Sequence, residues 1–578
     1  MNNIKNKKYK MRKIFFKLSL LAGVIVMFSP TFLHADKVHN IGNNKSAGAQ
    51  KSMAAGCLPA TGVSELNLNN VRARINTGGD MWWDLQGVAK YEIPKNSGKM
   101  SMFSASLWLA GVDVNGQLKC AALRYRQVGN DYWPGPLTTD GTAAVDPETC
   151  DKYDRHFPIT RSEVETFKAW FADPASYPDY VIPKSILDWP AHGDISKKQS
   201  YYLAPFFDYN GDGSYDPNDG DYPYYDFENS LCPRNKENLH KPPQPTMEGN
   251  GILADQVLKG DQTLWWVFND KGNVHTESSG EPIGVEIRAQ AFCFATNDEI
   301  NNMTFYSYEI INRSTYRLTG TYFSQWVDID LGWADDDYVG CDVLRGLGYC
   351  CNGKDIDGNG QAWAYGIQPP AVGVDFFQGP YMDPDGLDNP KYDQNGNQIC
   401  DESINGVNFG DSIVDNERFG MRRFVYHNNS NSGVPNYMTD PEKASEYYNF
   451  LRGIWKDGTK MLYGGNAHSS SGAYGPECDF MFPGDTDPCN WGTGGQPPNG
   501  PKYWTEKTAG NQPEDRRFMQ SAGPFTLEAG AVNYITVGIP WARAAAGGAW
   551  ASVELLRIVD DKCQRLFDNC FKVVDGPD

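Results

Sequence analysis

Alternation between apolar and polar positions is strongest between residues 262 and 330, where four segments show the two-residue period of β-strands. They are rich in Val, Ile, Tyr, Phe and Trp, and each is followed by a turn-like stretch of Asn, Asp or Gly. The segments read QTLWWVFND, GVEIRAQAFCFATND, MTFYSYEIINRS and GTYFSQWVDID. Similar runs occupy residues 99–126 and the surroundings of Phe525 and Ile535. We expect a mainly β fold of antiparallel β-sandwich units, with long calcium-binding loops and a few short helices.

Three segments carry helix signals instead. Residues 160–163, TRSE, form a capping-box sequence in front of EVETFKAWFAD, which stops before Pro174. Asp440-Pro441-Glu442 offers an N-cap and a proline at the first helical position, for a helix running to about Trp455. Residues 551–571, ASVELLRIVDDKCQRLFDNCF, predict a third helix near the end of the chain.

These elements suggest six consecutive segments. They are a signal peptide (1–35), a flexible leader (36–60), an N-terminal β-rich region with a short helix (61–200), a calcium loop with a central β-sandwich (201–350), Asp/Asn/Gly-rich metal-binding loops (351–440), and a helix, late strands and C-terminal helix (441–578).

The first 35 residues have the pattern of a secretory signal peptide. A basic stretch precedes an apolar run from Leu18 to Phe28, and Leu33-His34-Ala35 is a small-residue cleavage pattern. The apolar run is too short to span a membrane, and no later run reaches about 18 apolar residues. We expect a secreted protein, extracellular or at the cell surface after cleavage near Ala35, with no membrane span.

The strongly negative net charge of the chain excludes some classes of binding partner. The formal net charge is −20, and removal of residues 1–35, which hold seven Lys/Arg and no acids, changes it to −27. Such a chain repels nucleic acid and anionic membranes and attracts cations.

All thirteen cysteines lie beyond the predicted signal peptide, and none has zinc-site spacing. In an oxidising compartment they are expected to form disulfides, with at least one left over. Cys341 and Cys350 are close enough in sequence to pair across a short loop.

The stretch FFDYNGDGSYDPNDGDYPYYD, residues 206–226, predicts a calcium site. Oxygen-bearing side chains occupy positions 1, 3, 5, 9 and 12 of a twelve-residue loop, with Gly213 at position 6 and the backbone carbonyl of Ser214 at position 7. A divalent ion would cancel the repulsion among these carboxylates. The flanks look extended, so the loop is expected without an EF-hand helix pair. The predicted ligands are Asp208, Asn210, Asp212, Ser214, Asp216 and Asp219.

Further acidic stretches are candidate metal sites, with ordinary Asx-rich turns as the alternative. One set follows the central strands: Asp355, Asp357, Asn359, Asp383, Asp385, Asp388, Asp393, Asn395, Asn397 and Asp401. Another lies at the end of a predicted strand: Asp328, Asp330, Asp335, Asp336, Asp337 and Asp342.

Several segments together resemble large secreted or cell-surface proteins of Bacteroidota associated with type IX secretion. They include ARINTGGDMWWDL, ASLWLAGVDVNGQLKCAALRYRQVGNDYWPGPL, WVDIDLGWADDDYVGCD, PPAVGVDFFQGP, INGVNFGDSIVDNERFGMRRFVYHNN and FMQSAGPFTLEAGAVNYITVGIPWARA. Such proteins usually carry a C-terminal sorting domain, which is not seen in this sequence. The resemblance implies export and a place at the cell surface, and no particular activity.

The sequence offers no catalytic motif, neither a GxSxG elbow, nor HExxH, nor a phosphate loop, and its histidines are scattered. Aromatic clusters such as Trp82-Trp83 and Trp265-Trp266 suit stacking on sugar rings and suit a sandwich core equally well. We therefore expect a calcium-stabilised extracellular or surface protein with a structural or adhesive role, whose partner is a surface protein or glycan. The alternatives are a glycan-binding protein, and a glycoside hydrolase or other secreted hydrolase, because a carboxylate pair leaves no trace in sequence.

Overall fold

The four strand-like segments between residues 262 and 330 are strands in the computed structural model, which describes residues 55–126, 129–224, 259–400, 406–430, 433–569 and 571. They are β12 (Gln262–Asn269), β13 (Val285–Cys293), β14 (Thr304–Asn312) and β15 (Leu318–Ile329). The first three are antiparallel neighbours in one sheet, and β15 belongs to another. The mainly β fold is therefore confirmed. The predicted signal peptide, most of the leader and Asp401 lie outside the described residues.

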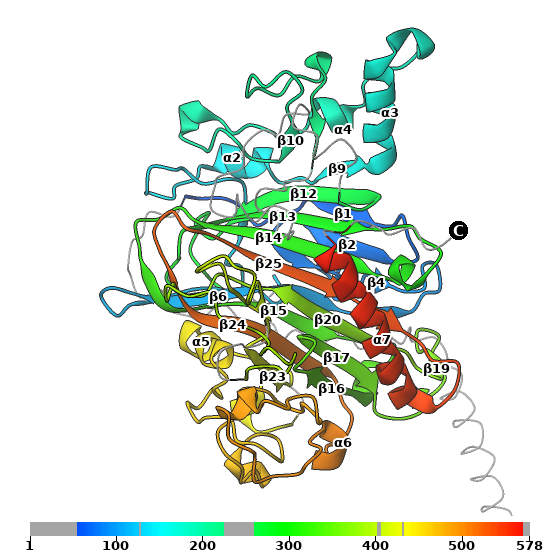
Figure 1. Cartoon of the computed structure of the whole chain (residues 1–578), viewed down its shortest axis with the longest axis vertical. Coiled ribbons are helices and arrows are strands. Elements are labelled where there is room, and N and C mark those ends of the chain that lie inside the picture. The colour runs from blue at the N-terminus through cyan, green and yellow to red at the C-terminus, as the bar shows by residue number, and fades with distance from the viewer. Residues whose placement is uncertain are drawn as a thin grey trace, which may run out of the picture. The chain divides into compact units, whose positions relative to one another are not determined.

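Two ten-stranded antiparallel sheets dominate the fold (Figure 1). The first sheet has the order β23-β24-β15-β6-β3-β2-β4-β5, with β1 on β2 and β7 on β6. Its other strands are β1 (Val63–Leu66), β2 (Arg72–Asn76), β3 (Asp80–Met81), β4 (Tyr91–Glu92), β5 (Met100–Met102), β6 (Ser104–Asp113), β7 (Leu118–Ala121), β23 (Arg423–His427) and β24 (Arg516–Leu527).

The second sheet has the order β16-β17-β20-β25-β14-β13-β12-β8, with β9 on β12 and β26 on β20. Its other strands are β8 (Trp133–Pro134), β9 (Phe157–Thr160), β16 (Asp337–Asp342), β17 (Leu347–Asn352), β20 (Ala371–Gln378), β25 (Val532–Ile539) and β26 (Trp541–Ala542). Three two-stranded hairpins complete the β structure: β10 (Phe206–Phe207) with β11 (Tyr222–Pro223), β18 (Ile356–Asp357) with β19 (Gly366–Ile367), and β21 (Gly406–Val407) with β22 (Arg418–Phe419).

The two sheets pack face to face as a sandwich. Trp82, next to β3, donates from Nε1 to the hydroxyl of Tyr306 on β14 at 2.9 Å. Gln520 on β24 donates from Nε2 to the carbonyl oxygen of Val374 on β20 at 3.1 Å. Trp82, Trp83, Trp265 and Trp266 are all less than 2% exposed. The tryptophan pairs therefore belong to the core, and their rings are not available to stack on a sugar.

Helix α7 (Gly548–Asp568) covers the outer face of the second sheet. Val553, Leu556, Val559 and Cys563 recur at helical spacing and pack in one core cluster with Phe377 of β20. Burying each aliphatic side chain contributes about 1.5–3 kcal/mol. The predicted C-terminal helix is thus confirmed, with its start three residues earlier.

A smaller α-rich region packs against β12. It contains α2 (Pro147–Lys152), α3 (Arg161–Ala172) and α4 (Lys184–Leu187), and its own core joins Phe167 of α3 and Tyr222 of β11 to Trp265 of β12. The predicted capping box is present, because Thr160 accepts from the Glu163 N–H and Glu163 accepts from the Thr160 N–H.

The helix expected from Asp440 begins later. Helix α5 (Ala444–Leu451) has Lys443 at its N-cap and ends before Trp455. Asp440 is held by other partners instead, because its carboxylate lies 3.2 Å from Arg124 Nη1 and 3.4 Å from His427 Nδ1. The short helix α6 (Glu506–Ala509) follows further along the chain.

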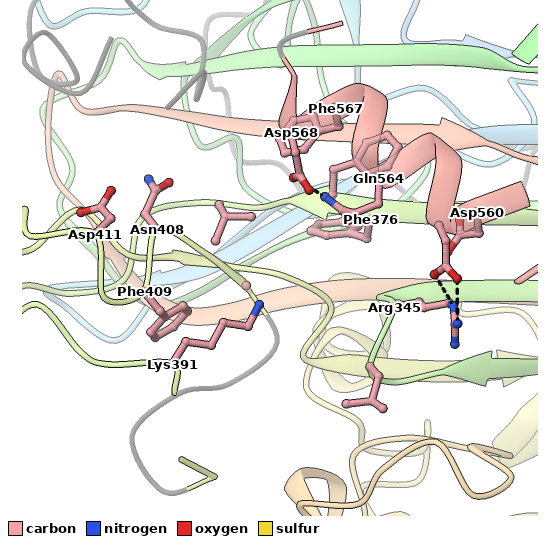
Figure 2. Close-up of a pocket in the computed structure, with 15 residues that line it drawn as sticks. Arg345, Phe376, Lys391, Asn408, Phe409, Asp411, Asp560, Gln564, Phe567 and Asp568 are labelled. Carbon is pink, nitrogen blue, oxygen red and sulfur yellow. Dashed lines mark hydrogen bonds and ion pairs between the residues drawn. The ribbon is translucent and has the colours of Figure 1, made fainter. Parts of the chain in front are cut away.

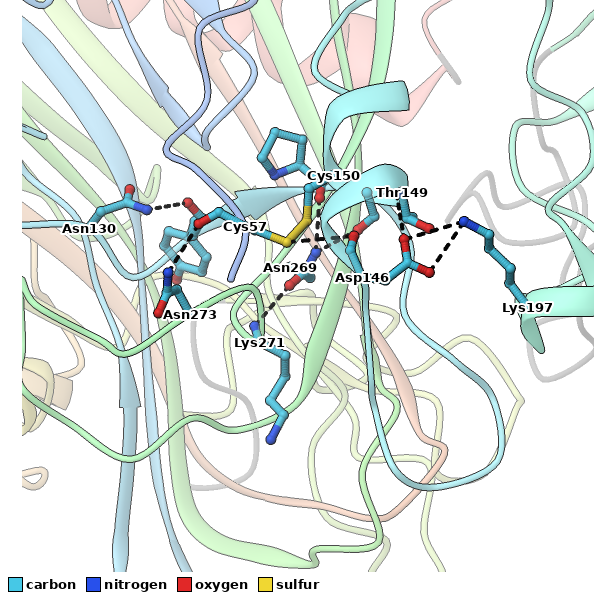
Figure 3. The surroundings of a disulfide bond; sticks show 12 residues. Cys57, Asn130, Asp146, Thr149, Cys150, Lys197, Asn269, Lys271 and Asn273 are labelled. Carbon is cyan, nitrogen blue, oxygen red and sulfur yellow. Dashed lines mark hydrogen bonds and ion pairs between the residues drawn. A yellow bond between two sulfur atoms is a disulfide. The ribbon is translucent and has the colours of Figure 1, made fainter. Parts of the chain in front are cut away.

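Disulfides join Cys57 to Cys150 and Cys400 to Cys489 among the described residues. The first attaches the start of the described chain to α2, and the Cys57 N–H also donates to the Gly272 carbonyl at 3.0 Å (Figure 3). Each bond closes a loop of roughly ninety residues, 93 and 89 apart in sequence.

The predicted Cys341–Cys350 disulfide is wrong, since both thiols are free. The two cysteines lie on the β16–β17 hairpin, where Cys341 pairs with Gly348 and Cys350 with Val339. That register makes them diagonal neighbours, roughly 7–8 Å apart. A disulfide needs Cα atoms about 4.4–6.8 Å apart, so spacing along the chain was a poor guide. The expectation of at least one unpaired cysteine holds, because seven described cysteines are free.

Within the described ranges, no helix combines the length and the apolar character needed to cross a membrane.

Candidate metal centre

The predicted calcium loop, residues 208–219, connects β10 to β11 and folds back on its own backbone. Asp208 is buried, and its two carboxylate oxygens accept the N–H groups of Gly211 and Gly213, each at 2.7 Å. Asp212 accepts the Ser214 N–H at 2.7 Å, and Asp216 accepts the Asn218 N–H at 2.9 Å. These bonds fix a tight acidic turn with Gly213 at a positive φ of 79°.

Asp221, rather than Asp219, closes this loop. Its buried carboxylate accepts the Tyr209 N–H and the Asp216 N–H, each at 2.8 Å, and so bridges the two ends of the turn. Burial raises the pKa of Asp221, and the charges of Asp208 and Asp212 raise it further. Asp221 was in the acidic stretch but two residues past the position that the twelve-residue spacing assigns.

The predicted metal ligands after residue 350 lie apart from one another and accept hydrogen bonds from different parts of the backbone. Asp355 accepts the Ala549 N–H at the start of α7, and Asp357 accepts the Trp333 N–H at 3.0 Å. The carboxylates at 383, 385, 388 and 393 accept backbone N–H groups of Thr526, Leu387, Gly410 and Asn395, respectively. Asn359 is exposed, and Asn395 and Asn397 donate their N–H groups to Asp393 in one exposed turn. The structure does not bring these residues together as one site.

Three carboxylates do converge at the end of the β15–β24 strand pair. Ligand atoms of Asp328, Asp330 and Asp515 all lie within 4.8 Å of one another, the one such group of acids, cysteines or histidines in the described part of the chain. The register explains it: Asp328 pairs with Arg517 and Ile329 with Arg516. One step further along each strand, Asp330 faces Asp515. Side chains two residues apart share a face of a strand, so all three carboxylates and Arg517 lie on the same face.

The hydrogen-bond partners leave one edge of this cluster open. Asp328 Oδ2 accepts from the Tyr125 hydroxyl and lies 3.3 Å from Arg517 Nη2, whereas Asp328 Oδ1 is buried and has no donor among the described residues. Asp515 accepts from Asn429 Nδ2 at 2.8 Å and lies 3.2 Å from Arg517 Nη1. The Asp330 carboxylate receives no hydrogen bond from the described residues, whereas its backbone carbonyl accepts the Gly332 N–H at 3.0 Å. A buried carboxylate oxygen without a donor is costly unless a cation meets it.

Burial and mutual repulsion disfavour the ionised forms of the three carboxyl groups. Burial raises the pKa of Asp328, and the charges of Asp515 and Asp330 raise it further. Burial, with the charge of Asp335, raises the pKa of Asp330 to about 7. The pKa of Asp515 is raised by burial and then by Asp330. A bound cation would reverse these shifts, because it favours the ionised carboxylates.

The other acids of the 328–342 stretch serve different contacts. Asp335 is exposed, and Asp336 accepts from Asn352 Nδ2 at 2.6 Å. Asp337 accepts the Leu331 N–H at 3.1 Å. Asp342 forms ion pairs with Arg345 at 3.0 Å and Arg557 at 3.1 Å, so its charge is already balanced.

A buried polar network holds the cluster from one side. Arg517 Nε donates to the Tyr125 hydroxyl oxygen at 3.1 Å and lies 3.9 Å from Asp440, which in turn pairs with Arg124. Arg124 Nε donates to Glu277 at 2.6 Å, and the Tyr447 hydroxyl of α5 donates to the same carboxylate at 2.6 Å. Four stretches of the chain, at residues 124–125, 277, 440 and 447, are therefore linked to the ends of β15 and β24.

Sequence reasoning found Asp328 and Asp330 but missed Asp515 and Arg517. The signal is present as EDRR, residues 514–517, directly before a strand-like run. These residues can be recognised as part of a site only once β24 is known to pair with β15.

No protein-family model matches this chain, and a search of the curated proteins finds no relative.

Proposed function

We propose that this chain is a secreted, calcium-stabilised β-sandwich protein of the extracellular space or cell surface, with a structural or adhesive role. The observation that carries the proposal is the convergence of Asp328, Asp330 and Asp515 within 4.8 Å at the end of two central strands. An ion there would join β15 to β24 where their hydrogen-bonded pairing ends.

Charge and donor type favour calcium. Three carboxylates against the guanidinium of Arg517 leave two negative charges, which one divalent cation balances. The donors are all oxygen atoms, which suits a hard cation such as Ca²⁺, whereas zinc sites use mostly nitrogen and sulfur. Backbone carbonyls and water complete such sites, since Ca²⁺ takes six to eight oxygens.

The loop at residues 208–219 is proposed as a second calcium site. Its side-chain spacing supports this, and so does the raised pKa of Asp221 beside Asp208 and Asp212. The ligand set would then include Asp221 as the closing carboxylate.

Export is supported by the two disulfides, which form and persist in oxidising compartments. The predicted signal peptide and the resemblance to surface proteins of Bacteroidota associated with type IX secretion point the same way. The partner in this proposal is a surface protein or a glycan, recognised on a scaffold that calcium makes rigid.

Thermal unfolding of purified residues 36–578, with added Ca²⁺ or with EGTA, tests the metal. Calcium should raise Tm, because a ligand that binds only the folded state stabilises it by mass action. Metal analysis after dialysis should return at least one Ca²⁺ per chain. Equal Tm values in calcium and EGTA, with no retained ion, contradict the proposal. Adhesion is tested separately, by calcium-dependent attachment of labelled protein to cells of the source organism.

A further inference from the structure

A pocket of about 450 Å³ lies on the outer side of the second sheet, beside helix α7 (Figure 2). The last turns of α7 form one side through Asp560, Gln564 and Asp568, which recur every four residues on one helix face. Lys391 and the residues from Gly406 to Phe409, with Asp411, form the other side, and Phe376 of β20 lies between them.

Aromatic rings line this pocket from three elements. Phe376 comes from β20, Phe567 from α7 and Phe409 from the loop after β21, and each is less than 10% exposed. The faces of aromatic rings carry partial negative charge and attract organic cations.

The charged side chains of the lining are mostly acidic. Four aspartates stand against Arg345 and Lys391, a formal excess of two negative charges: Asp411, Asp560, Asp561 and Asp568. Arg345 is already neutralised, because its guanidinium binds Asp561 at 2.8 and 3.1 Å and Asp342 at 3.0 Å. The positive charge of Arg345 therefore does not offset the remaining acids.

Asp560 is a buried acid in the lining of the pocket. It is only 1% exposed, and no N–H group of the described chain donates to its Oδ1. Directly behind it lies the buried carboxyl group of Asp375. Helix α7 also ends at this pocket, at Asp568, so the partial negative charge of its last carbonyl groups adds to that of the carboxylates.

We propose that this pocket binds a small organic cation, an ammonium or guanidinium group that carries apolar substituents. The rings would receive the apolar substituents, Asp568 would receive the charge, and the bound cation would favour the ionised form of Asp560. A neutral or anionic ligand of the same size would leave the excess of carboxylates unbalanced. The inference does not depend on the proposed calcium sites.

Two probes of equal shape and different charge test this inference. Choline carries a quaternary ammonium group, and 3,3-dimethylbutan-1-ol replaces its nitrogen with carbon. Each probe is titrated into the purified chain in calcium-containing buffer, and binding is measured by calorimetry or ligand-observed NMR. Choline should bind saturably, and the neutral alcohol should bind at least about tenfold more weakly.

Variants on one helix separate pocket binding from general attraction to an acidic protein. Asp568→Asn should weaken choline binding about three- to tenfold, because it removes a rim charge without disturbing the core. Glu554→Gln removes the same charge from an exposed position of α7 outside the pocket and should change nothing. Asp560→Asn gives a second variant, expected to weaken binding at least as much. Equal affinity for the two probes, no saturation by choline, or equal effects of Asp568→Asn and Glu554→Gln would overturn the proposal.

Discussion

Asp330 lies opposite Asp515 at the open end of the β15–β24 pair, one position past the last paired residues, with carboxylate oxygens within 4.8 Å of each other. Two aspartates that face each other in this way repel, and cross-strand pairs of like charge destabilise a sheet. The arrangement favours the fold when a cation stands between them.

Asp515→Asn should have opposite effects with and without calcium. In calcium it removes a proposed ligand, so the rise in Tm on adding Ca²⁺ should shrink to less than half. In EGTA it removes a buried repulsion, so the variant should melt at or above the temperature of the original protein. Thermal unfolding in both buffers measures this.

Asp179→Asn is the control for that variant, since Asp179 is exposed and distant in sequence from the cluster. It makes the same chemical change and should leave Tm unaltered in both buffers. A loss of Tm in EGTA as large as the loss in calcium would indicate that Asp515 has a structural role unrelated to metal.

Arg517→Gln should be strongly destabilising. Arg517 is fully buried and lies within 3.3 Å of both Asp328 and Asp515. Its removal leaves those carboxylates uncompensated, which costs about 3–5 kcal/mol of the free energy of unfolding. Urea unfolding measures the loss, and Arg565→Gln, on the exposed side of α7, should cost less than about 0.5 kcal/mol.

Cys150→Ser should lower the free energy of unfolding by about 2–5 kcal/mol, because the Cys57–Cys150 bond restricts the unfolded chain across a long loop. Addition of a reductant should reduce the stability of the original protein in the same direction. Peptide mapping without reductant should recover Cys57 linked to Cys150 and Cys341 unlinked to Cys350. A cross-linked Cys341–Cys350 peptide would contradict the register of β16 and β17.

The buried pair Asp375 and Asp560 should make the fold less stable as pH rises. Burial raises the pKa of both groups, and the charge of Asp560 raises that of Asp375 further. An acid whose pKa is higher in the folded than in the unfolded chain contributes its stability at low pH, and loses it from about pH 4 upward through the folded-state pKa. Asp560→Asn should therefore be nearly neutral at pH 4 and raise the free energy of unfolding by about 1–3 kcal/mol at pH 8.

Denaturant unfolding of Asp560→Asn at several pH values checks this slope. Glu554→Gln on the same helix gives the matched comparison, and its stability should follow the pH dependence of the original protein. Parallel curves for all three proteins would mean that the two carboxyl groups do not titrate between pH 4 and 8.

Local patterns predicted the elements whose signal is contained in one segment. The strands between residues 262 and 330, the capping box at Thr160 and Glu163, and the amphipathic helix α7 were all found in this way. Helix α5 was placed too early because Asp440, the expected N-cap, instead contacts Arg124 and His427, which only the fold brings near.

The candidate metal centre could be predicted only in part, for the same reason. Asp328 and Asp330 stand at the end of a recognisable strand, but Asp515 reaches them through the register of a strand almost two hundred residues away. Neither the spacing of the acids along the chain nor the composition predicts how β15 and β24 align. The sequence does show that both segments end in acids, and strand pairing decides which acids meet.

Both sheets are interleaved along the chain, and this has a consequence for how the protein reaches its folded state. β24 lies between β23 and β15 in the first sheet, and β25 lies at the centre of the second beside β14, yet both come after residue 515. Long-range strand pairing of this kind is slow to form, because the chain loses the entropy of closing a large loop before the new contacts contribute favourable free energy. Neither sheet can close until nearly the whole polypeptide has left the ribosome. Most of the nascent chain should therefore stay without stable tertiary structure throughout synthesis, and it should acquire its final topology only near the end.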